Sequence, residues 1–285
     1  MTAPIHLPTL FDYLRRAPFG GRLSATQVSG VERLMAACAE AGITDDRHVS
    51  YVLASVFHET GARMQPVRET FATSDAQAIR RLDAAMAAGR LRQVRRPYWR
   101  DGWFGRGDIQ VTHERNYRKI GEAIGADLVA QPALLLDPAI SAKATAIGMR
   151  DGLYTGRKLA DYFNATVDDP EGARRIVNGT DKASLIAGYH RAIWDSFLAA
   201  RREGAKTAAP AAPAPVADGP DLKTDQTAIG GVLAGLGGLG GIAAAAGPVL
   251  QGVTNVWALL ALVVVLVGVG LVLTGRLKLK LQGGV

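Results

Sequence analysis

The sequence predicts a mainly helical domain over residues 1–203, followed by a membrane-associated C-terminal segment. Two observations predict this division. Apolar residues recur at helical spacing in the first part of the chain, and strand-like alternation is scarce. In contrast, no charged residue occurs from Ala228 to Gly275, and the 20 residues from Val256 to Gly275 can cross a hydrocarbon core about 30 Å thick.

Helices are expected at six places, each indicated by caps or by apolar spacing. Ser24 and Gln27 form a capping-box pair at the start of the first helix. The second shows a core-facing stripe of Val49, Val52, Leu53, Val56 and Phe57, and the last repeats Leu185, Tyr189, Ile193 and Phe197 every four residues. The expected ranges are 24–42, 46–61, 75–89, 113–125, 138–153 and 181–203.

The remainder of the chain divides by composition. Residues 204–227 are rich in Ala and Pro, which is typical of an extended linker. Residues 228–250 are a Gly/Ala-rich segment that is either a second span or a surface-active segment. Its glycine pairs, at the spacing of close helix contacts, favour self-association between helices. The span at 256–275 precedes a basic tail, 276–285, which the positive-inside tendency assigns to the cytoplasm of a bacterial cell.

Charge and cysteine content restrict the partners. The net charge of +7 favours anionic partners such as acidic phospholipid or cell-wall polymers. Nucleic acid is not expected, because no RNA-binding motif, zinc-finger spacing or basic recognition helix occurs. The single cysteine, Cys38, excludes an intrachain disulfide and is expected in the core. Residues 1–21 lack an unbroken apolar stretch, so no secretory signal peptide is expected there.

The first candidate for chemistry is Glu59, within His58-Glu59-Thr60-Gly61 at the end of the second helix. It falls near the edge of the apolar stripe, where partial desolvation suits a carboxyl group to act as a general acid. A solvated glutamate at a helix end is the alternative. A zinc site of the H-E-x-x-H type is excluded because Ala62 occupies the last position, and no metal or organic cofactor is expected.

A second carboxylate, Glu69, follows closely in sequence. Glycoside hydrolysis needs two carboxyl groups flanking the scissile bond. Glu69 can be the partner of Glu59 only if the intervening loop folds back over the cleft, which the spacing permits. Glu114 and Asp101 are the alternatives for this role.

A Gly-rich aromatic stretch, Trp103 to Thr112, completes the candidate site. Its glycines allow a ligand to approach the backbone closely. In and around it, the neutral polar groups are Gln110, Thr112 and Asn116, and the flat faces suited to sugar rings are Tyr98, Trp99, Trp103 and Tyr117.

In order, His58-Glu59-Thr60, Phe104-Gly105-Arg106-Gly107 with Ile109-Gln110-Val111-Thr112, and Arg175-Ile176-Val177-Asn178-Gly179 resemble the motifs of family 19 glycoside hydrolases. That family includes plant-type chitinases and phage endolysins, and the stretch from Arg174 to Lys182 is more similar to the endolysins. The resemblance covers residues 25 to 200. It implies a two-lobed, lysozyme-like domain and an enzyme that inverts anomeric configuration.

By this resemblance Glu59 matches the catalytic acid, Thr112 the hydroxyl that holds the attacking water, and Glu69 the second carboxylate. Substrate contacts are expected from His58, Tyr98, Trp103, Gln110, Asn116, Tyr117 and Asn178. Nothing in the resemblance accounts for the C-terminal span.

We therefore expect a peptidoglycan-degrading endolysin, cleaving β-1,4 bonds and anchored in the bacterial inner membrane, with glycan strands and membrane lipid as partners. The first alternative is a chitinase. A wall-binding protein with an inactive cleft is the second, and a pore-forming protein whose tail is the active part is the third.

Overall fold

A computed structural model describes residues 3–208 of the chain. The predicted segments 228–250, 256–275 and 276–285 lie outside these residues, as does most of the predicted linker. Within residues 3–208, no helix combines the length and apolar composition needed to cross a membrane.

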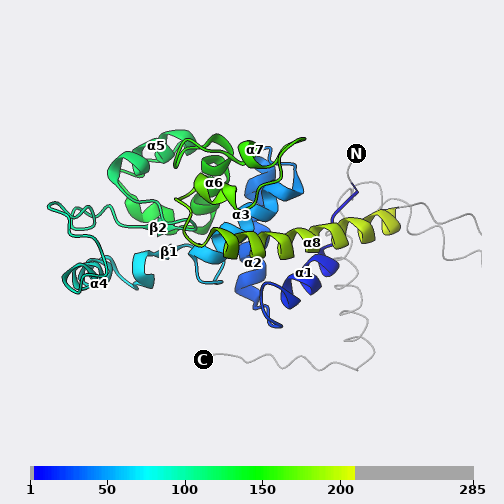
Figure 1. Ribbon diagram of the computed structural model, residues 1–285, viewed down its shortest axis with the longest axis horizontal. Coiled ribbons are helices and arrows are strands. Elements are labelled where there is room, and N and C mark those ends of the chain that lie inside the picture. Colours follow the sequence, from blue (N-terminus) through cyan, green and yellow to red (C-terminus); the bar gives the residue numbers. More distant parts are fainter. Residues whose placement is uncertain (1–2, 209–285) are drawn as a thin grey trace, which may run out of the picture. The chain divides into compact units, whose positions relative to one another are not determined.

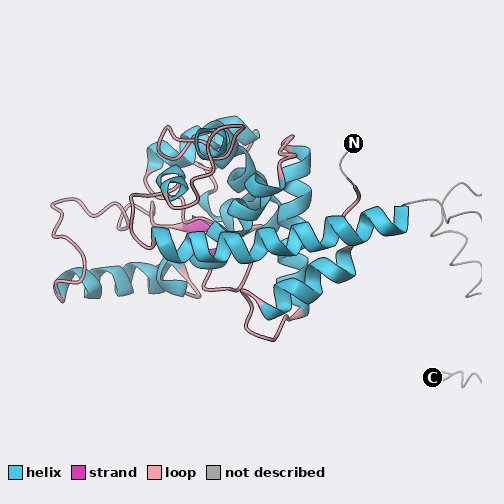
Figure 2. Ribbon diagram, turned by 45° about the vertical axis from the view of Figure 1, so that its right-hand side comes forward, coloured by secondary structure: helices cyan, strands magenta, loops and turns pink. Residues whose placement is uncertain are grey.

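The described part is mainly helical, as the sequence predicts (Figure 2). Its α-helices are α1 (Leu7–Arg16), α2 (Ala25–Glu40), α3 (Asp46–Glu59), α4 (Asp75–Ala87), α5 (Glu114–Ile124), α6 (Pro138–Asp151), α7 (Leu159–Tyr162) and α8 (Ala183–Ala208). Short 3-10 helices are η1 (Glu69–Phe71), η2 (Pro132–Leu136) and η3 (Gly172–Ile176). The two strands, β1 (Val67–Arg68) and β2 (Arg106–Gly107), pair antiparallel, with Val67 opposite Gly107.

Helix α3 is the centre of the main core. Every residue from Val49 to Phe57 is buried, which differs from the one-sided stripe predicted for this helix. The reason is that α8 packs along α3 while α2 and α6 also contact it (Figure 1). Small or hydroxylated side chains such as Ser50, Ala54 and Ser55 fill the side that the stripe left unassigned. The end of α3 that carries Glu59 is therefore held by a helix whose central residues are all tightly packed.

Helix α8 runs past its predicted end. It continues to Ala208, so the first five residues of the predicted linker are helical. Gly204 is buried there, and a Cβ at this position would lie 1.9 Å from the carbonyl oxygen of Pro4, so contact with the N-terminal segment explains the extension. The predicted repeat on α8 is also wrong at Leu185, which is 46 % exposed. A strict four-residue repeat drifts by about 40° per step around a helix, which rotates Leu185 off the face that Ile193 and Phe197 bury.

A smaller apolar cluster supports α4 and the loop that follows it. Its buried members are Ala72, Ala78, Leu82, Trp99 and Phe104. It is separate from the main core and from a third cluster around Tyr117 and Leu135. Figure 1 shows α4 at the edge of the domain, and α4 packs against η1, which directly follows β1. This edge carries Glu69, whereas the main core carries Glu59.

Candidate active site

Glu59 is the last residue of α3, where the buried helix reaches the surface. Thr60 ends the helix: its buried hydroxyl donates to the carbonyl of Val56 (2.7 Å) and accepts from the backbone N–H of Met64 (3.0 Å). The chain then reverses through residues with positive φ, Gly61 (57°) and Ala62 (63°). This tight reversal leaves the Glu59 side chain 17 % exposed at the helix end.

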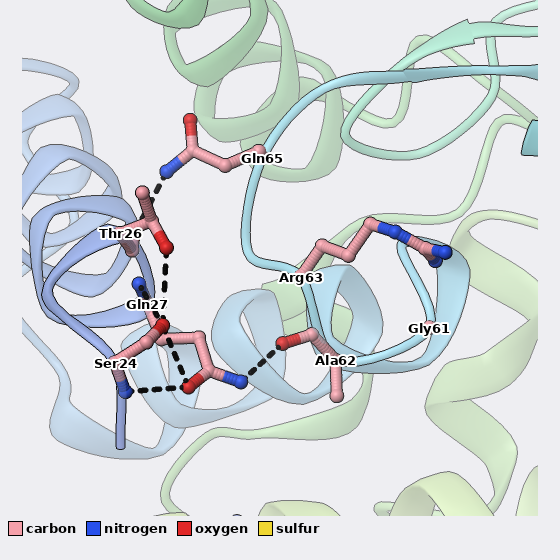
Figure 3. A pocket seen from close by; sticks show the side chains of 7 residues that line it. All are labelled: Ser24, Thr26, Gln27, Gly61, Ala62, Arg63 and Gln65. Atoms are coloured by element: carbon pink, nitrogen blue, oxygen red, sulfur yellow. Dashed lines mark hydrogen bonds between the residues drawn. The ribbon is translucent and has the colours of Figure 1, made fainter. Parts of the chain in front are cut away.

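The loop after Glu59 is tied to the start of α2. Figure 3 shows the hollow between them, about 350 Å³ in volume. The Gln27 side-chain amide donates to the carbonyl of Ala62 (2.9 Å), and Gln65 donates to that of Thr26 (2.8 Å). Gln27 also forms a capping box with Ser24, which confirms the prediction for the start of this helix. These bonds use the polar groups of the hollow to fix the turn that follows Glu59.

Arg174 holds the Glu59 carboxylate through a direct ion pair. Its Nη1 donates to Glu59 Oε1 at 2.6 Å, and its Nε donates to the carbonyl of Asp181 at 3.1 Å. The Arg174 side chain is only 4 % exposed, so a charge-assisted bond in a poorly solvated place fixes the carboxylate. The contact was not predictable from the motif that contains Arg174, because it joins residues 115 positions apart.

Glu69 is brought to the same place by the pairing of β1 with β2. The backbone of Gly105 accepts from the Glu69 N–H (2.7 Å) and donates to Glu69 Oε2 (2.7 Å). Tyr98 donates from its hydroxyl to Oε1 at 3.4 Å. Burial raises the pKa of Glu69, and the hydrogen bonds from Gly105 and Tyr98 oppose that shift.

The backbone after Glu69 is strained. Thr70 and Phe71 have φ values of 60° and 53°, in a region that residues with a Cβ rarely adopt. The guanidinium of Arg63 lies 4.3 Å from the centroid of the Phe71 ring, so the loops after the two carboxylates contact each other. Strain of this kind persists only where its surroundings enforce it, and it is concentrated at functional sites.

One cleft brings the two glutamates together. It has a volume of about 350 Å³ and is lined by Glu59, Glu69, Ile109, Gln110, Thr112, Val177 and Asn178. Gln110 has a positive φ (57°), and its amide donates to the carbonyls of Val67 (3.0 Å) and Gly107 (3.1 Å). Thus five of the predicted site residues, from four separate parts of the chain, share one cavity.

Other selected residues lie outside this lining. The Asn116 side chain donates to the carbonyl of Thr112 (2.8 Å) and so supports its backbone. His58 is half-buried beside Glu59, and burial lowers its pKa. Trp103 is half-buried against the Tyr117 ring, with centroids 5.4 Å apart. Glu114, one alternative for the second carboxylate, pairs with Arg118 on the surface instead.

The predicted substrate contact at Tyr117 is wrong. Its side chain is fully buried, and its hydroxyl donates to the carbonyl of Phe104 (2.7 Å) and accepts from Arg106 (2.9 Å). Trp99 is likewise buried, with its indole N–H bonded to Asp83 (2.9 Å). Neither ring has a free face for a sugar. Aromatic side chains near a glycine-rich loop serve packing as readily as binding, and sequence spacing does not separate the two.

Among residues 3–208, no group of three or more His, Cys, Asp or Glu side chains is arranged to hold a metal ion. Cys38 is buried as predicted, and burial raises the pKa of its thiol to about 12.

Residues 34–150 match the family model of chitinase class I, glycoside hydrolase family 19. Chitinase 11 of Oryza sativa subsp. japonica is 47 % identical over 117 residues, which cover 33 % of this chain and 46 % of that protein. Endochitinase 4 of Solanum tuberosum is 51 % identical over 43 residues, covering 15 % of this chain and 14 % of that protein. The chain therefore spans less than half the length of these relatives.

Among solved structures, chitinase C from Streptomyces griseus HUT6037 aligns with a TM-score of 0.42 and 20 % identity, covering 68 % of this chain and 75 % of that one. The matched residues 34–150 contain Glu59, Glu69, Gln110 and Thr112, whereas Arg174 and Asn178 lie beyond them. The similarity to glycoside hydrolase family 19, chitinase class I, thus extends over residues 34–150, which hold both glutamates of the cleft.

Proposed function

We propose that this protein hydrolyses β-1,4 glycosidic bonds of peptidoglycan, with Glu59 as general acid and Glu69 as general base. The observation that carries the proposal is that both carboxyl groups line one cleft together with Thr112. Inverting glycosidases need this combination: an acid on one side of the bond, and a base and a water on the other.

In the proposed reaction, Glu59 gives its proton to the glycosidic oxygen as the bond to the anomeric carbon breaks. Arg174 binds Oε1, which leaves Oε2 as the oxygen that carries the proton. Water attacks the anomeric carbon from the opposite face, and Glu69 takes a proton from it. One water molecule is consumed, two chain ends form, and a proton returned from Glu69 through solvent to Glu59 closes the cycle.

The surroundings of Glu69 support its role as the base. Burial raises the pKa of the carboxyl group, which makes its ionised form a stronger proton acceptor. The Gly105 N–H holds Oε2 at 2.7 Å, so the carboxylate keeps one orientation. We assign Thr112 to orient the water, and Gln110 and Asn178 to contact the sugar, because all three line the same cleft.

Two features of the sequence support peptidoglycan as the substrate. These are the endolysin-like residues from Arg174 to Lys182 and the hydrophobic C-terminal sequence. Chitin is the second candidate, favoured by the names of the plant relatives. Both are β-1,4-linked polymers of N-acetylated sugars, so the same pair of carboxyl groups serves either.

We further propose that residues 256–275 anchor the enzyme in the bacterial inner membrane and that it acts in phage-type lysis. With 228–250 as a second span, the two segments form a hairpin and both chain ends stay cytoplasmic. Alkaline phosphatase fused after residue 205, and separately after Val285, tests this. Activity of either fusion in intact cells excludes the hairpin, and activity of the first alone establishes a single span.

The substrate is tested by incubating the full chain with purified sacculi and, in parallel, with chitin oligomers. Mass spectrometry of the soluble products identifies the new reducing sugar. We expect muropeptide products from sacculi, together with inversion of configuration in a proton NMR time course. Products from chitin alone would establish the second candidate, and products from neither would refute both.

A further inference from the structure

A run of positive charge follows helix α4. Between Asp83 and Asp101 the sequence contains five arginines and no acidic residue. Four of these, Arg90, Arg92, Arg95 and Arg96, fall within residues 89–96, which we call the cationic arm. The fifth, Arg100, is neutralised by an ion pair with Asp83 (2.9 Å).

The four arm arginines are exposed and have no side-chain hydrogen bond or ion pair among residues 3–208. The arm itself is nevertheless ordered at both ends. Before it, α4 packs through Leu82 and Met86, and Gln93 donates to the carbonyl of Met86 (2.8 Å). After it, the buried Trp99 bonds Asp83 (2.9 Å). A loop anchored at both ends therefore presents a concentrated positive charge that no acidic side chain among residues 3–208 neutralises.

The arm is connected directly to the cleft. Tyr98, two residues after Arg96, donates to the Glu69 carboxylate (3.4 Å). From α4, Arg81 donates to the carbonyl of Thr70 (2.8 Å), the residue after Glu69. The arm and Glu69 are thus parts of one edge of the domain, and α4 lies at that edge in Figure 1. The segments on both sides of the arm, through Arg81 and Tyr98, therefore contact the part of the chain that carries Glu69.

We propose that the cationic arm binds the carboxylates of peptidoglycan stem peptides and so selects peptidoglycan over uncharged glycans. This deepens the proposed function and rests on it. Stem peptides branch from the glycan strand and carry free carboxylates, whereas chitin carries no charge. Arginine suits such a target because its planar guanidinium pairs with carboxylates through two parallel hydrogen bonds.

The arm acts through attraction at the surface. Exposed pairs are individually weak, so the effect requires several arginines acting together on a multiply charged polymer. Salt screens such contacts, since the Debye length falls to about 3 Å at 1 M. Affinity for sacculi is therefore expected to fall steeply as salt is added. The turnover of neutral oligomers is expected to change little over the same salt range.

The test uses the full chain with Glu59→Gln, so that binding is measured without cleavage. Three surfaces are compared by co-sedimentation: intact sacculi, sacculi whose carboxylates have been amidated with carbodiimide and ethanolamine, and vesicles containing phosphatidylglycerol. The arm variant replaces Arg90, Arg92, Arg95 and Arg96 by Gln. The matched control replaces four exposed arginines outside the arm, Arg22, Arg157, Arg191 and Arg202, by Gln.

The proposal expects the arm variant to bind intact sacculi about tenfold more weakly than the control variant. On amidated sacculi the two variants should bind equally. When the same arginine substitutions are made in a protein that retains Glu59, the arm variant and the control variant should turn over chitin oligomers at equal rates.

Equal binding of the two variants to intact sacculi overturns the cationic arm. So does a loss by the arm variant that is confined to the vesicles, since the partner would then be lipid. The proposed function is tested in a separate experiment, with the protein that retains Glu59. If that protein releases no new reducing ends from sacculi, the proposed function fails, whatever the binding results.

Discussion

Arg174 Nη1 lies 2.6 Å from Glu59 Oε1, joining η3 to the end of α3 across 115 positions of sequence. The pair is poorly solvated, because the Arg174 side chain is 4 % exposed and the Glu59 side chain is 17 % exposed. An arginine in this place has one evident use, which is to hold the carboxyl group in a single orientation.

Replacing Arg174 by Gln should lower kcat by about 10²-fold and leave KM within a few-fold, since misplacement of a catalytic group by about 1 Å costs that much. Steady-state kinetics on a soluble oligomer measure the split. Circular dichroism provides the control for folding, and the exposed neighbour Arg175→Gln provides the matched variant. A rise in KM alone would identify Arg174 as a substrate contact.

Glu69→Gln should abolish most of the activity and also change how stability depends on pH. Because burial raises its pKa, Glu69 contributes stability that is present below its unfolded value near 4.5 and is lost as pH rises through the folded value. The variant should therefore gain stability relative to wild type as the pH rises above about 4.5. Urea unfolding at several pH values measures this, and an unchanged difference would contradict the buried, ionised carboxylate.

Thr112→Ala should slow the chemical step by about tenfold, the worth of roughly one neutral hydrogen bond, with KM little affected. A hydroxyl that orients water acts on the transition state more than on the bound substrate. Thr112→Ser, which keeps the hydroxyl, is the matched control and should retain most of the rate. A selective rise in KM would instead assign Thr112 to sugar binding.

We expect the stability of the core to decrease in acid because of His190. It is buried against α3, and burial lowers its pKa to about 4. The unfolded chain takes up a proton near pH 6.5, whereas the folded chain does not. The free energy of unfolding therefore decreases as the pH is lowered from about 6.5 to about 4. The contribution is on the order of 3 kcal/mol. His190→Gln should flatten the stability profile in that window, and an equally steep profile would show that other groups cause it.

The helices were largely predictable because caps and apolar spacing are local properties. Helix α2 begins at its capping box and α6 at Asp137, whose side chain accepts from two backbone N–H groups. Helix α1 was missed, since its ten residues include a proline and only Leu10 and Leu14 become buried. Strands β1 and β2 have two residues each, too few to show alternation.

The site was predictable only in part. Glu59 and Thr112 follow from motifs, but the folding back of Glu69 depends on the β1–β2 pairing and on the Gly105 backbone, which are long-range contacts. Arg174 adjoins Arg175 in sequence, and nothing local distinguishes the buried guanidinium from the exposed one. The buried ring of Tyr117 shows the opposite error, in which a packing residue resembles a binding residue.

Glu59 carries the central claim, and its replacement by Gln tests it most directly. The substitution keeps the shape and the hydrogen bond to Arg174 but removes the transferable proton. Release of reducing ends from sacculi should fall by about 10²–10⁴-fold, with the fold intact by circular dichroism. Hydrolysis by Glu59→Gln at a rate near that of the unmodified protein would contradict the account.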